Sequence, residues 1–147
     1  MNEATTSAAA VLIAPEQVAE IYRYAEATYP DECCGILLGR DTAEGRVVER
    51  LLEIENTWDE VERRRRFLIQ PQDLLRAERE GRRSGLDVLG FYHSHPDAPA
   101  RPSEFDREHA WPWYSYLICG VVQGKAQTLT GWQLRADRSA YDEVWVG

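Results

Sequence analysis

The sequence predicts an α/β domain in which a mixed central sheet has helices packed on it. Two segments, 15–28 and 71–84, begin with proline and carry apolar residues at helical spacing. Short apolar segments alternate with them at 34–38, 86–92 and 115–122. Helices that alternate with buried strands along a chain are typical of a sheet covered by helices.

Length and composition indicate one folded domain. At 147 residues the chain is large enough for an ordinary core, so we expect a single domain over 1–147, with 1–11 flexible. Five tryptophans, seven tyrosines and an apolar fraction of 44% argue against disorder. A net charge of −8 disfavours nucleic acid and anionic membranes as partners.

The sequence shows no sign of export or membrane insertion. The N-terminal segment has neither the positive charge nor the long apolar core of a signal peptide. No stretch approaches the roughly 20 apolar residues that span a bilayer. Of the three cysteines, Cys33 and Cys34 are adjacent and Cys119 is left over, so a disulfide framework is not expected. We therefore expect a cytoplasmic protein with buried thiols.

The first third of the chain predicts one helix and two strands. In 15–28, Val18, Ile21 and Ala25 share one helical face, and Pro30 follows the helix. Residues 34–38 form a short apolar strand that Gly39 closes. Residues 46–54 alternate enough to be a half-exposed strand.

The middle of the chain is charged before it becomes helical. Residues 56–66 contain the run 63–66 of four arginines, either a solvated loop or a flap that orders on a partner. A short strand is expected at 67–69. The helix 71–84 carries Leu74, Leu75 and Ala77 on its inner face and ends near Gly85.

The last elements surround a polar stretch. Residues 86–92 predict a buried strand that ends at two histidines, and three prolines within 96–102 predict a stiff loop after it. Residues 103–109 fit a short helix. Strands are expected at 115–122, and then at 127–134 and 142–146, which complete the sheet.

His93 and His95 lie two residues apart on the predicted strand, so their side chains share one face of the sheet. At about 3.3 Å per residue their Cα atoms are about 6.6 Å apart, which lets both imidazoles reach one ion. Asp106, in the first turn of the next helix, can add an oxygen. Two nitrogens and one oxygen leave a fourth tetrahedral position open, as in catalytic zinc sites. This donor set suits zinc first and other divalent first-row metals next.

These residues also have purely structural explanations. A His-x-His pair alone is a weak signal, and Ser103 with Asp106 matches a capping box, which is compatible with a functional role. His109 is expected at the surface or beside the ligands rather than as a ligand. Trp111 and Trp113 either line a cleft or belong to the core.

The whole pattern resembles a known motif. His93-x-His95, seven residues, and Ser103-x-x-Asp106 resemble the JAMM motif of the MPN-domain zinc metalloproteases. The segment 30–39 resembles the upstream element of that family, with Glu32 in its acidic position. The resemblance extends from about residue 14 to 122, and all five positions match.

The resemblance implies a fold and a set of roles. The fold would be the three-layer, cytidine-deaminase-like MPN domain of the stand-alone prokaryotic type. His93, His95 and Asp106 would hold Zn²⁺. Glu32 would be the general acid and base, and Ser103 would stabilise the transition state of metal-assisted amide hydrolysis.

The resemblance also suggests a substrate. Compact prokaryotic members trim small ubiquitin-like sulfur-carrier proteins after a C-terminal Gly-Gly, and we favour such a carrier as the partner. One alternative is a general isopeptidase that removes ubiquitin-like modifiers. Another is a non-catalytic MPN scaffold, which the five filled positions disfavour. The segments 56–66 and 97–101 could line a groove for the carrier's Gly-Gly tail. The carrier's identity and a homodimeric state stay open.

Overall fold

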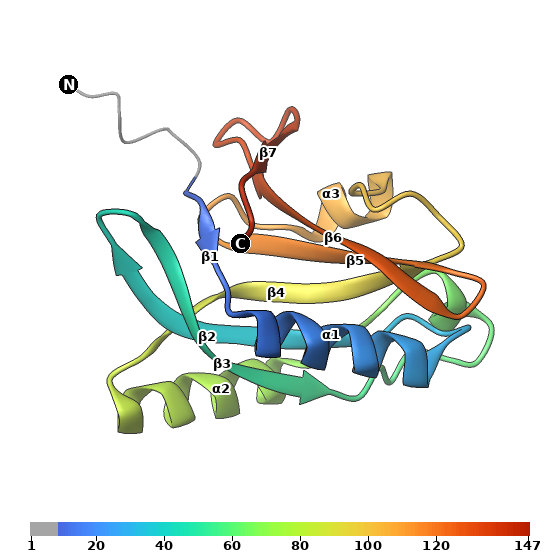
Figure 1. The fold of residues 1–147 in the computed structure, drawn as a ribbon, viewed down its shortest axis with the longest axis horizontal. Coiled ribbons are helices and arrows are strands. Elements are labelled where there is room, and N and C mark those ends of the chain that lie inside the picture. The colour runs from blue at the N-terminus through green and yellow to red at the C-terminus, as the bar shows by residue number, and fades with distance from the viewer. Residues whose placement is uncertain (1–8) are drawn as a thin grey trace.

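A seven-stranded mixed sheet forms the centre of the structure, a computed structural model that describes residues 9–147 (Figure 1). The strand order is β1-β3-β2-β4-β5-β6-β7, and the β1–β3 and β4–β5 pairs are parallel while the others are antiparallel. The strands are β1 (Val11–Leu12), β2 (Cys34–Thr42), β3 (Gly45–Ile54), β4 (Asp87–Pro96), β5 (Ser115–Val122), β6 (Lys125–Leu134) and β7 (Tyr141–Val144).

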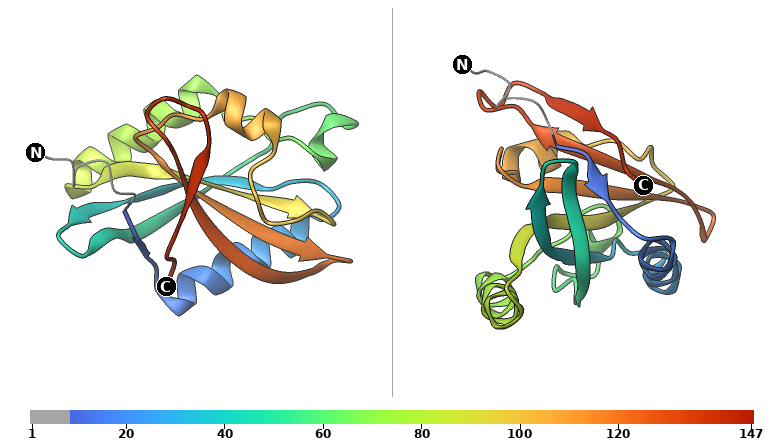
Figure 2. Two further views of the ribbon diagram at one scale, coloured as in Figure 1. Left: turned by 90° about the horizontal axis from the view of Figure 1, so that it is seen from above. Right: turned by 60° about the vertical axis from the view of Figure 1, so that its left-hand side comes forward.

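Helices cover both faces of this sheet. The helical elements are α1 (Pro15–Thr28), the 3₁₀ turn η2 (Glu62–Arg64), α2 (Pro71–Ser84) and α3 (Glu104–His109). In Figure 2, α1 and α2 lie on opposite sides of the sheet. The predicted fold class, an α/β domain with helices on a mixed sheet, is confirmed. No helix of the described chain is long and apolar enough to cross a membrane.

Each sheet face has its own apolar cluster. Ile21 and Ala25 of α1 are buried in a cluster with Leu37, Tyr92 and Leu117. On the other face, Ala77 of α2 packs in a cluster with Ile36 and Phe91, among others. Neighbouring residues of β4 thus point to opposite layers, as the period of two in a strand requires. All three cysteines are free and buried, as expected.

The two long helices have the predicted bounds. Pro15 and Pro71 occupy the first turns, where the missing N–H costs nothing. Gly85 ends α2 in the left-handed conformation, with φ 70°, as the sequence predicted. The predicted inner face of α2 is partly wrong, because Leu75 is 44% exposed while Ala77 and Gly81 are the buried residues.

Two strand predictions need correction. β2 does not close at Gly39 but continues to Thr42, because it forms a hairpin with β3 that passes Gly39 at a bulge. The predicted strand at 67–69 is wrong. In this segment backbone N–H groups bond to side chains instead of to a neighbouring strand. Leu68 N donates to Asn56 Oδ1, and Gln70 N, the residue after the predicted strand, donates to Asp73 Oδ2.

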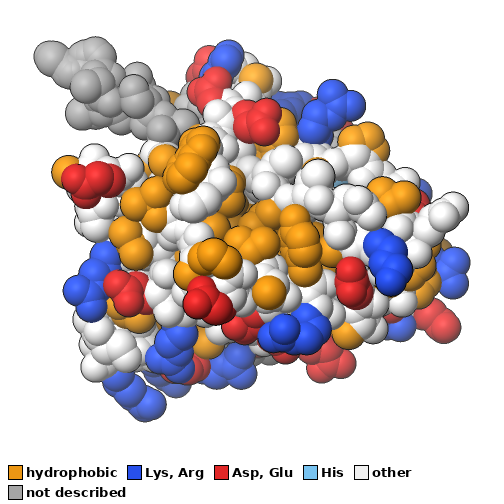
Figure 3. All heavy atoms as spheres, in the orientation of Figure 1, with side chains coloured by type: hydrophobic (Ala, Val, Ile, Leu, Met, Phe, Trp, Pro, Cys, Tyr) orange, Lys and Arg blue, Asp and Glu red, His pale blue; other side chains and the backbone are white. Residues whose placement is uncertain are grey.

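The N-terminal end of the described chain is part of the sheet. Val11, which we expected within a flexible segment, lies in β1 and is 1% exposed. Residues 1–8 of that segment lie outside the described residues. The face in Figure 3 mixes acidic and basic side chains around apolar ones, so the net charge of −8 does not gather into one acidic patch there.

Candidate metal centre

β4 presents its two histidines on the α2 face of the sheet. The Nε2 atoms of His93 and His95 lie 3.1 Å apart, and the two residues are 1% and 6% exposed, respectively. The ring of Phe67 stacks on His93 with centroids 4.4 Å apart. His95 Nδ1 lies 2.7 Å from the carbonyl oxygen of Pro99, in the loop after the strand. The orientation of each imidazole is therefore fixed by its own neighbour, Phe67 for His93 and Pro99 for His95.

α3 brings the third group to the same point. Asp106 Oδ2 is 3.3 Å from His93 Nε2 and 3.2 Å from His95 Nε2. The helix begins with a capping box: Asp106 N donates to Ser103 Oγ, and Ser103 N donates to Asp106 Oδ2. The capping box is therefore present, and its Asp106 carboxylate also faces the two histidines, so the capping and functional interpretations of this motif stay compatible.

The donor atoms at this point fit a divalent cation. A carbonyl oxygen only accepts, so we assign the His95 proton to Nδ1, which leaves the Nε2 lone pair facing the centre. Burial lowers the pKa of His93, which favours its neutral, ligating form. Burial opposes ionisation of Asp106, but the two imidazoles and Ser103 N hold its pKa well below the usual value. Neutral nitrogens and a carboxylate form the donor set of a zinc site.

Glu32 lies beside this group, placed by the pairing of β2 with β4. Cys34 is opposite His93, and Ser94 continues the pairing by accepting from Cys33 N with its Oγ at 2.8 Å. Glu32 lies two residues before Cys34, and its carboxyl is close enough to His95 and Asp106 to interact electrostatically with both. The residue is 4% exposed, and Oε1 has no hydrogen-bond partner among residues 9–147. Burial raises the pKa of Glu32 to about 8.

The loop of the arginine run is ordered against this centre. Arg63 pairs with Asp31 at 3.2 Å, and its carbonyl oxygen accepts from Glu32 N. Arg65 and Arg66 both pair with Glu62. The run is therefore not a fully solvated loop, since three of its four arginines pair with carboxylates.

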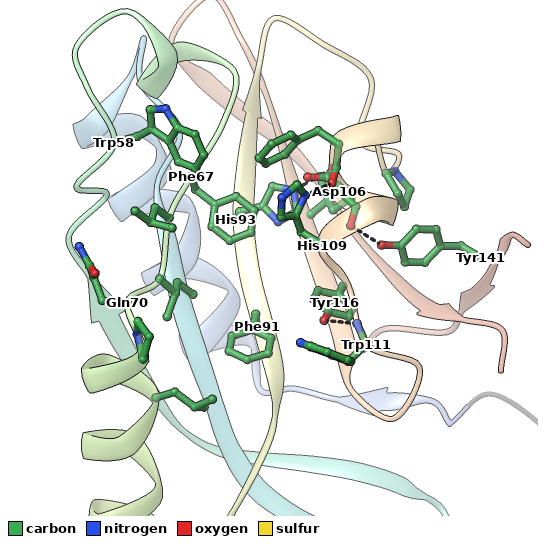
Figure 4. Close-up of a pocket in the computed structure, with 17 residues that line it drawn as sticks. Trp58, Phe67, Gln70, Phe91, His93, Asp106, His109, Trp111, Tyr116 and Tyr141 are labelled. Carbon is green, nitrogen blue, oxygen red and sulfur yellow. Dashed lines mark hydrogen bonds and ion pairs between the residues drawn. The ribbon is translucent and has the colours of Figure 1, made fainter. Parts of the chain in front are cut away.

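An apolar pocket of about 350 Å³ opens beside the ligands. It lies on the α2 face, over β4 and β5, and both His93 and Asp106 border it (Figure 4). Its other walls are mostly aromatic and aliphatic and include Trp58, Phe67, Leu74, Phe91, Phe105, Trp111, Tyr116 and Tyr141. Such a lining suits an apolar side chain next to the polar centre.

The structure brings together three of the five predicted site residues as a potential metal group, His93, His95 and Asp106, whose donor atoms lie within 4.8 Å of one another. Glu32 and Ser103 adjoin that group. His109 stays outside it, as expected, because its Nδ1 bonds the Phe105 carbonyl and its ring stacks on Phe105. No cysteine belongs to the group within the described chain.

The segment 56–66, which we expected to line a groove for the substrate, contributes Trp58 to the apolar pocket. Phe105 lies in the predicted short helix, and no local pattern in the sequence marks it as a neighbour of Trp58. The segment 97–101, which we considered as a groove wall, does not line the apolar pocket, although Pro102 does. Of the two tryptophans, Trp111 lines the pocket, and both are exposed rather than core.

The fold and this His-His-Asp group define an α/β domain with a candidate metal centre at the end of its sheet. Residues 15–135 match the family of prokaryotic homologs of the JAB domain, and the chain belongs to that family.

Two relatives in sequence have named activities. The chain is 38% identical over 91 residues to a desampylase of Haloferax volcanii, covering 61% of this chain and 63% of the relative. It is 36% identical over 92 residues to a probable TtuB-protein conjugate cleaving protease of Thermus thermophilus, covering 63% and 57%. The matches thus span less than two thirds of each relative.

Solved structures agree with the fold. A protein from Desulfitobacterium hafniense matches with a TM-score of 0.80 and 32% identity, covering 93% of this chain and 91% of that one. A JAB1/MPN domain protein from Archaeoglobus fulgidus matches with a TM-score of 0.53 and 19% identity, covering 96% and 98%. The second likeness concerns the fold alone.

Proposed function

We propose that this protein is a zinc-dependent peptidase that hydrolyses the amide bond after the C-terminal Gly-Gly of a small ubiquitin-like, sulfur-carrier type of protein. The observation that carries the proposal is the convergence of three ligand atoms, from His93, His95 and Asp106, next to the buried carboxyl of Glu32. The names of the two relatives, a desampylase and a conjugate-cleaving protease, support hydrolysis of protein conjugates.

His93, His95 and Asp106 would hold the zinc ion, which supplies a Lewis acid that activates water and polarises the scissile carbonyl. The chain contributes the surroundings. Asp106 is oriented by Ser103 N, and His95 by the Pro99 carbonyl, so neither ligand depends on the ion for its position.

Glu32 would move the proton in this reaction. Its carboxyl is buried beside the ligands, and Oε1 is left without a partner among residues 9–147, so it is available to a water molecule or a leaving amine. In the proposed reaction Glu32 takes a proton from the attacking water and delivers it to the amine nitrogen as the amide bond breaks.

Ser103 would stabilise negative charge on the carbonyl oxygen. Its Oγ accepts from Asp106 N, which leaves the hydroxyl proton free to donate to the substrate. A preorganised donor of this kind lowers the barrier because it is already oriented when charge develops.

The shape beside the centre suits a Gly-Gly tail. Glycine has no Cβ, so the two residues before the cut can pass close to the buried ligands. The apolar pocket begins at His93 and Asp106, and it would take an apolar side chain of the tail ahead of the glycines. Burial of one such side chain contributes about 1.5–3 kcal/mol.

Intact mass spectrometry of a candidate carrier tests the proposal. A carrier with a short extension after Gly-Gly is incubated with zinc-loaded protein, and the expected product ends at the second glycine. Replacing that glycine by valine should slow the cut strongly. If lysine-linked conjugates are cleaved while the extended carrier stays intact, the protein is a general isopeptidase instead. If neither substrate is cleaved, the result supports a non-catalytic scaffold.

A further inference from the structure

The side chain of Asn56 uses its full hydrogen-bonding capacity at the edge of the candidate centre. Its Nδ2 donates to the carbonyl oxygens of Glu32, at 3.0 Å, and Arg66, at 2.8 Å. Its Oδ1 accepts from the backbone N–H groups of Trp58 and Leu68, both at 3.2 Å. An asparagine side chain offers two donor hydrogens and two acceptor lone pairs, so none is left over.

Through these bonds Asn56 connects both ends of the loop 57–67 to the backbone of Glu32. Trp58 follows the start of the loop 57–67, and Arg66 and Leu68 flank its end. In the middle of the loop, the Arg63 carbonyl accepts from Glu32 N at 2.6 Å. The backbone of Glu32 therefore makes two hydrogen bonds here. Its N–H donates to Arg63 of the loop, and its C=O accepts from Asn56, the residue before the loop.

The same loop also reaches the helix that carries Asp106. The ring of Trp58 meets that of Phe105 edge-on with centroids 5.7 Å apart, and the Arg66 guanidinium lies 4.5 Å from the Phe105 ring centre. Trp58 and Phe105 both line the apolar pocket. A substrate in the pocket would thus contact the loop that holds Glu32.

We propose that Asn56 is a positioning residue that couples the 57–67 loop to Glu32, so that a tail packed against the loop fixes the carboxyl for proton transfer. This inference rests on the proposed peptidase function. Asn56 itself touches neither the ligands nor the reacting atoms, and it acts through the backbone of Glu32. A displacement of about 1 Å in a catalytic group can cost about 10²-fold in rate. We therefore expect the rate to fall measurably when the four hydrogen bonds of Asn56, which hold the loop against the Glu32 backbone, are lost.

The test compares Asn56→Ala with Thr57→Val. Thr57 is exposed and its Oγ1 accepts from Gln70 Nε2 at 3.0 Å, so the control loses a loop contact that does not involve Glu32. We expect Asn56→Ala to keep its metal content, to lose roughly 10–10²-fold in kcat on the extended carrier, and to change KM much less. Thr57→Val should remain within a few-fold of the original protein.

A double variant separates positioning from a general structural effect. If Asn56 acts through Glu32, adding Asn56→Ala to Glu32→Gln should lower the residual rate by less than about threefold. A full additional loss in the double variant would overturn the proposal. So would a fully active Asn56→Ala protein. A wild-type protein that cleaves no substrate would instead refute the proposed function itself.

Hydrogen exchange gives a readout without turnover. In Asn56→Ala, the amides of Trp58, Leu68 and Glu32 should exchange faster than in Thr57→Val, while the amides of β5 stay protected. If the Glu32 amide keeps its protection, the loop and the carboxyl segment are not coupled through Asn56, and the proposal is wrong.

Discussion

Asp106 and Ser103 bond each other in both directions: Asp106 N donates to Ser103 Oγ at 3.1 Å, and Ser103 N donates to Asp106 Oδ2 at 2.9 Å. The Asp106 oxygen that accepts from Ser103 N is the same one that faces the two histidines, at 3.2 and 3.3 Å. Helix initiation and the geometry of the candidate metal centre are therefore set by one motif.

The first prediction concerns metal content. Purified protein should bind about one zinc ion per chain, measured by elemental analysis, because three ligand atoms already converge. At a free zinc concentration of 100 times Kd, binding should raise the free energy of unfolding by about 2.7 kcal/mol. His93→Ala should abolish the binding, whereas Cys119→Ser should leave it unchanged. Zinc retained at full stoichiometry in His93→Ala would place the site elsewhere.

Replacement of Glu32 should separate metal binding from chemistry. Glu32→Gln should retain zinc and lose about 10²–10⁴-fold in kcat on the extended carrier, because it removes the proton acceptor. Glu55→Gln, at an exposed carboxyl directly after the end of β3, is the matched control and should stay active. A folded, zinc-loaded Glu32→Gln protein with normal turnover would exclude the proposed proton transfer.

Ser103 should affect both stability and rate. Ser103→Ala removes the helix cap, at a cost of about 1 kcal/mol in the free energy of unfolding. It should also lower kcat by about 10²-fold, because the donor to the carbonyl oxygen is lost. Ser103→Thr, which keeps the hydroxyl, should recover most of both effects, measured by urea unfolding and by steady-state kinetics. Equal rates for the alanine and threonine variants would remove the hydroxyl from the mechanism.

Trp111 should contribute to binding of the carrier. It lines the apolar pocket, and its neighbour Trp113 does not, although both are more than half exposed. Trp111→Ala should raise KM for the extended carrier by roughly 10-fold, which corresponds to about 1.4 kcal/mol, with kcat little changed. An equal or larger effect of Trp113→Ala would show that the pocket is not the contact surface.

Ser94 should matter for stability. It is fully buried, and its Oγ accepts from Cys33 N at the point where β2 meets β4. Ser94→Ala leaves that buried N–H without a partner and should cost about 1–3 kcal/mol in the free energy of unfolding. Ser139→Ala, at an exposed serine, should change it by less than about 0.5 kcal/mol. Comparable unfolding midpoints for the two variants would contradict this account.

Local patterns predicted most of the fold and the three residues of the His-His-Asp group. The bounds of α1 and α2 follow from Pro15, Pro71 and Gly85, whose backbone preferences act within one turn. The convergence of His93 and His95 follows from the period of two in a strand. The strand predicted at 67–69 failed because the contact of Leu68 N with Asn56 Oδ1, twelve residues away in the chain, is not visible as a local pattern.

By itself the sequence determined the class of fold, the order of most of its elements and three donor residues at strand and helix ends, because these depend on periodicity, turn residues and short spacing. Only the tertiary structure decided what surrounds them. The apolar pocket, the β2–β4 pairing that brings Glu32 near His95, and the four bonds of Asn56 join segments up to tens of residues apart. Such contacts form when layers pack and strands pair, and no local preference of the chain specifies them.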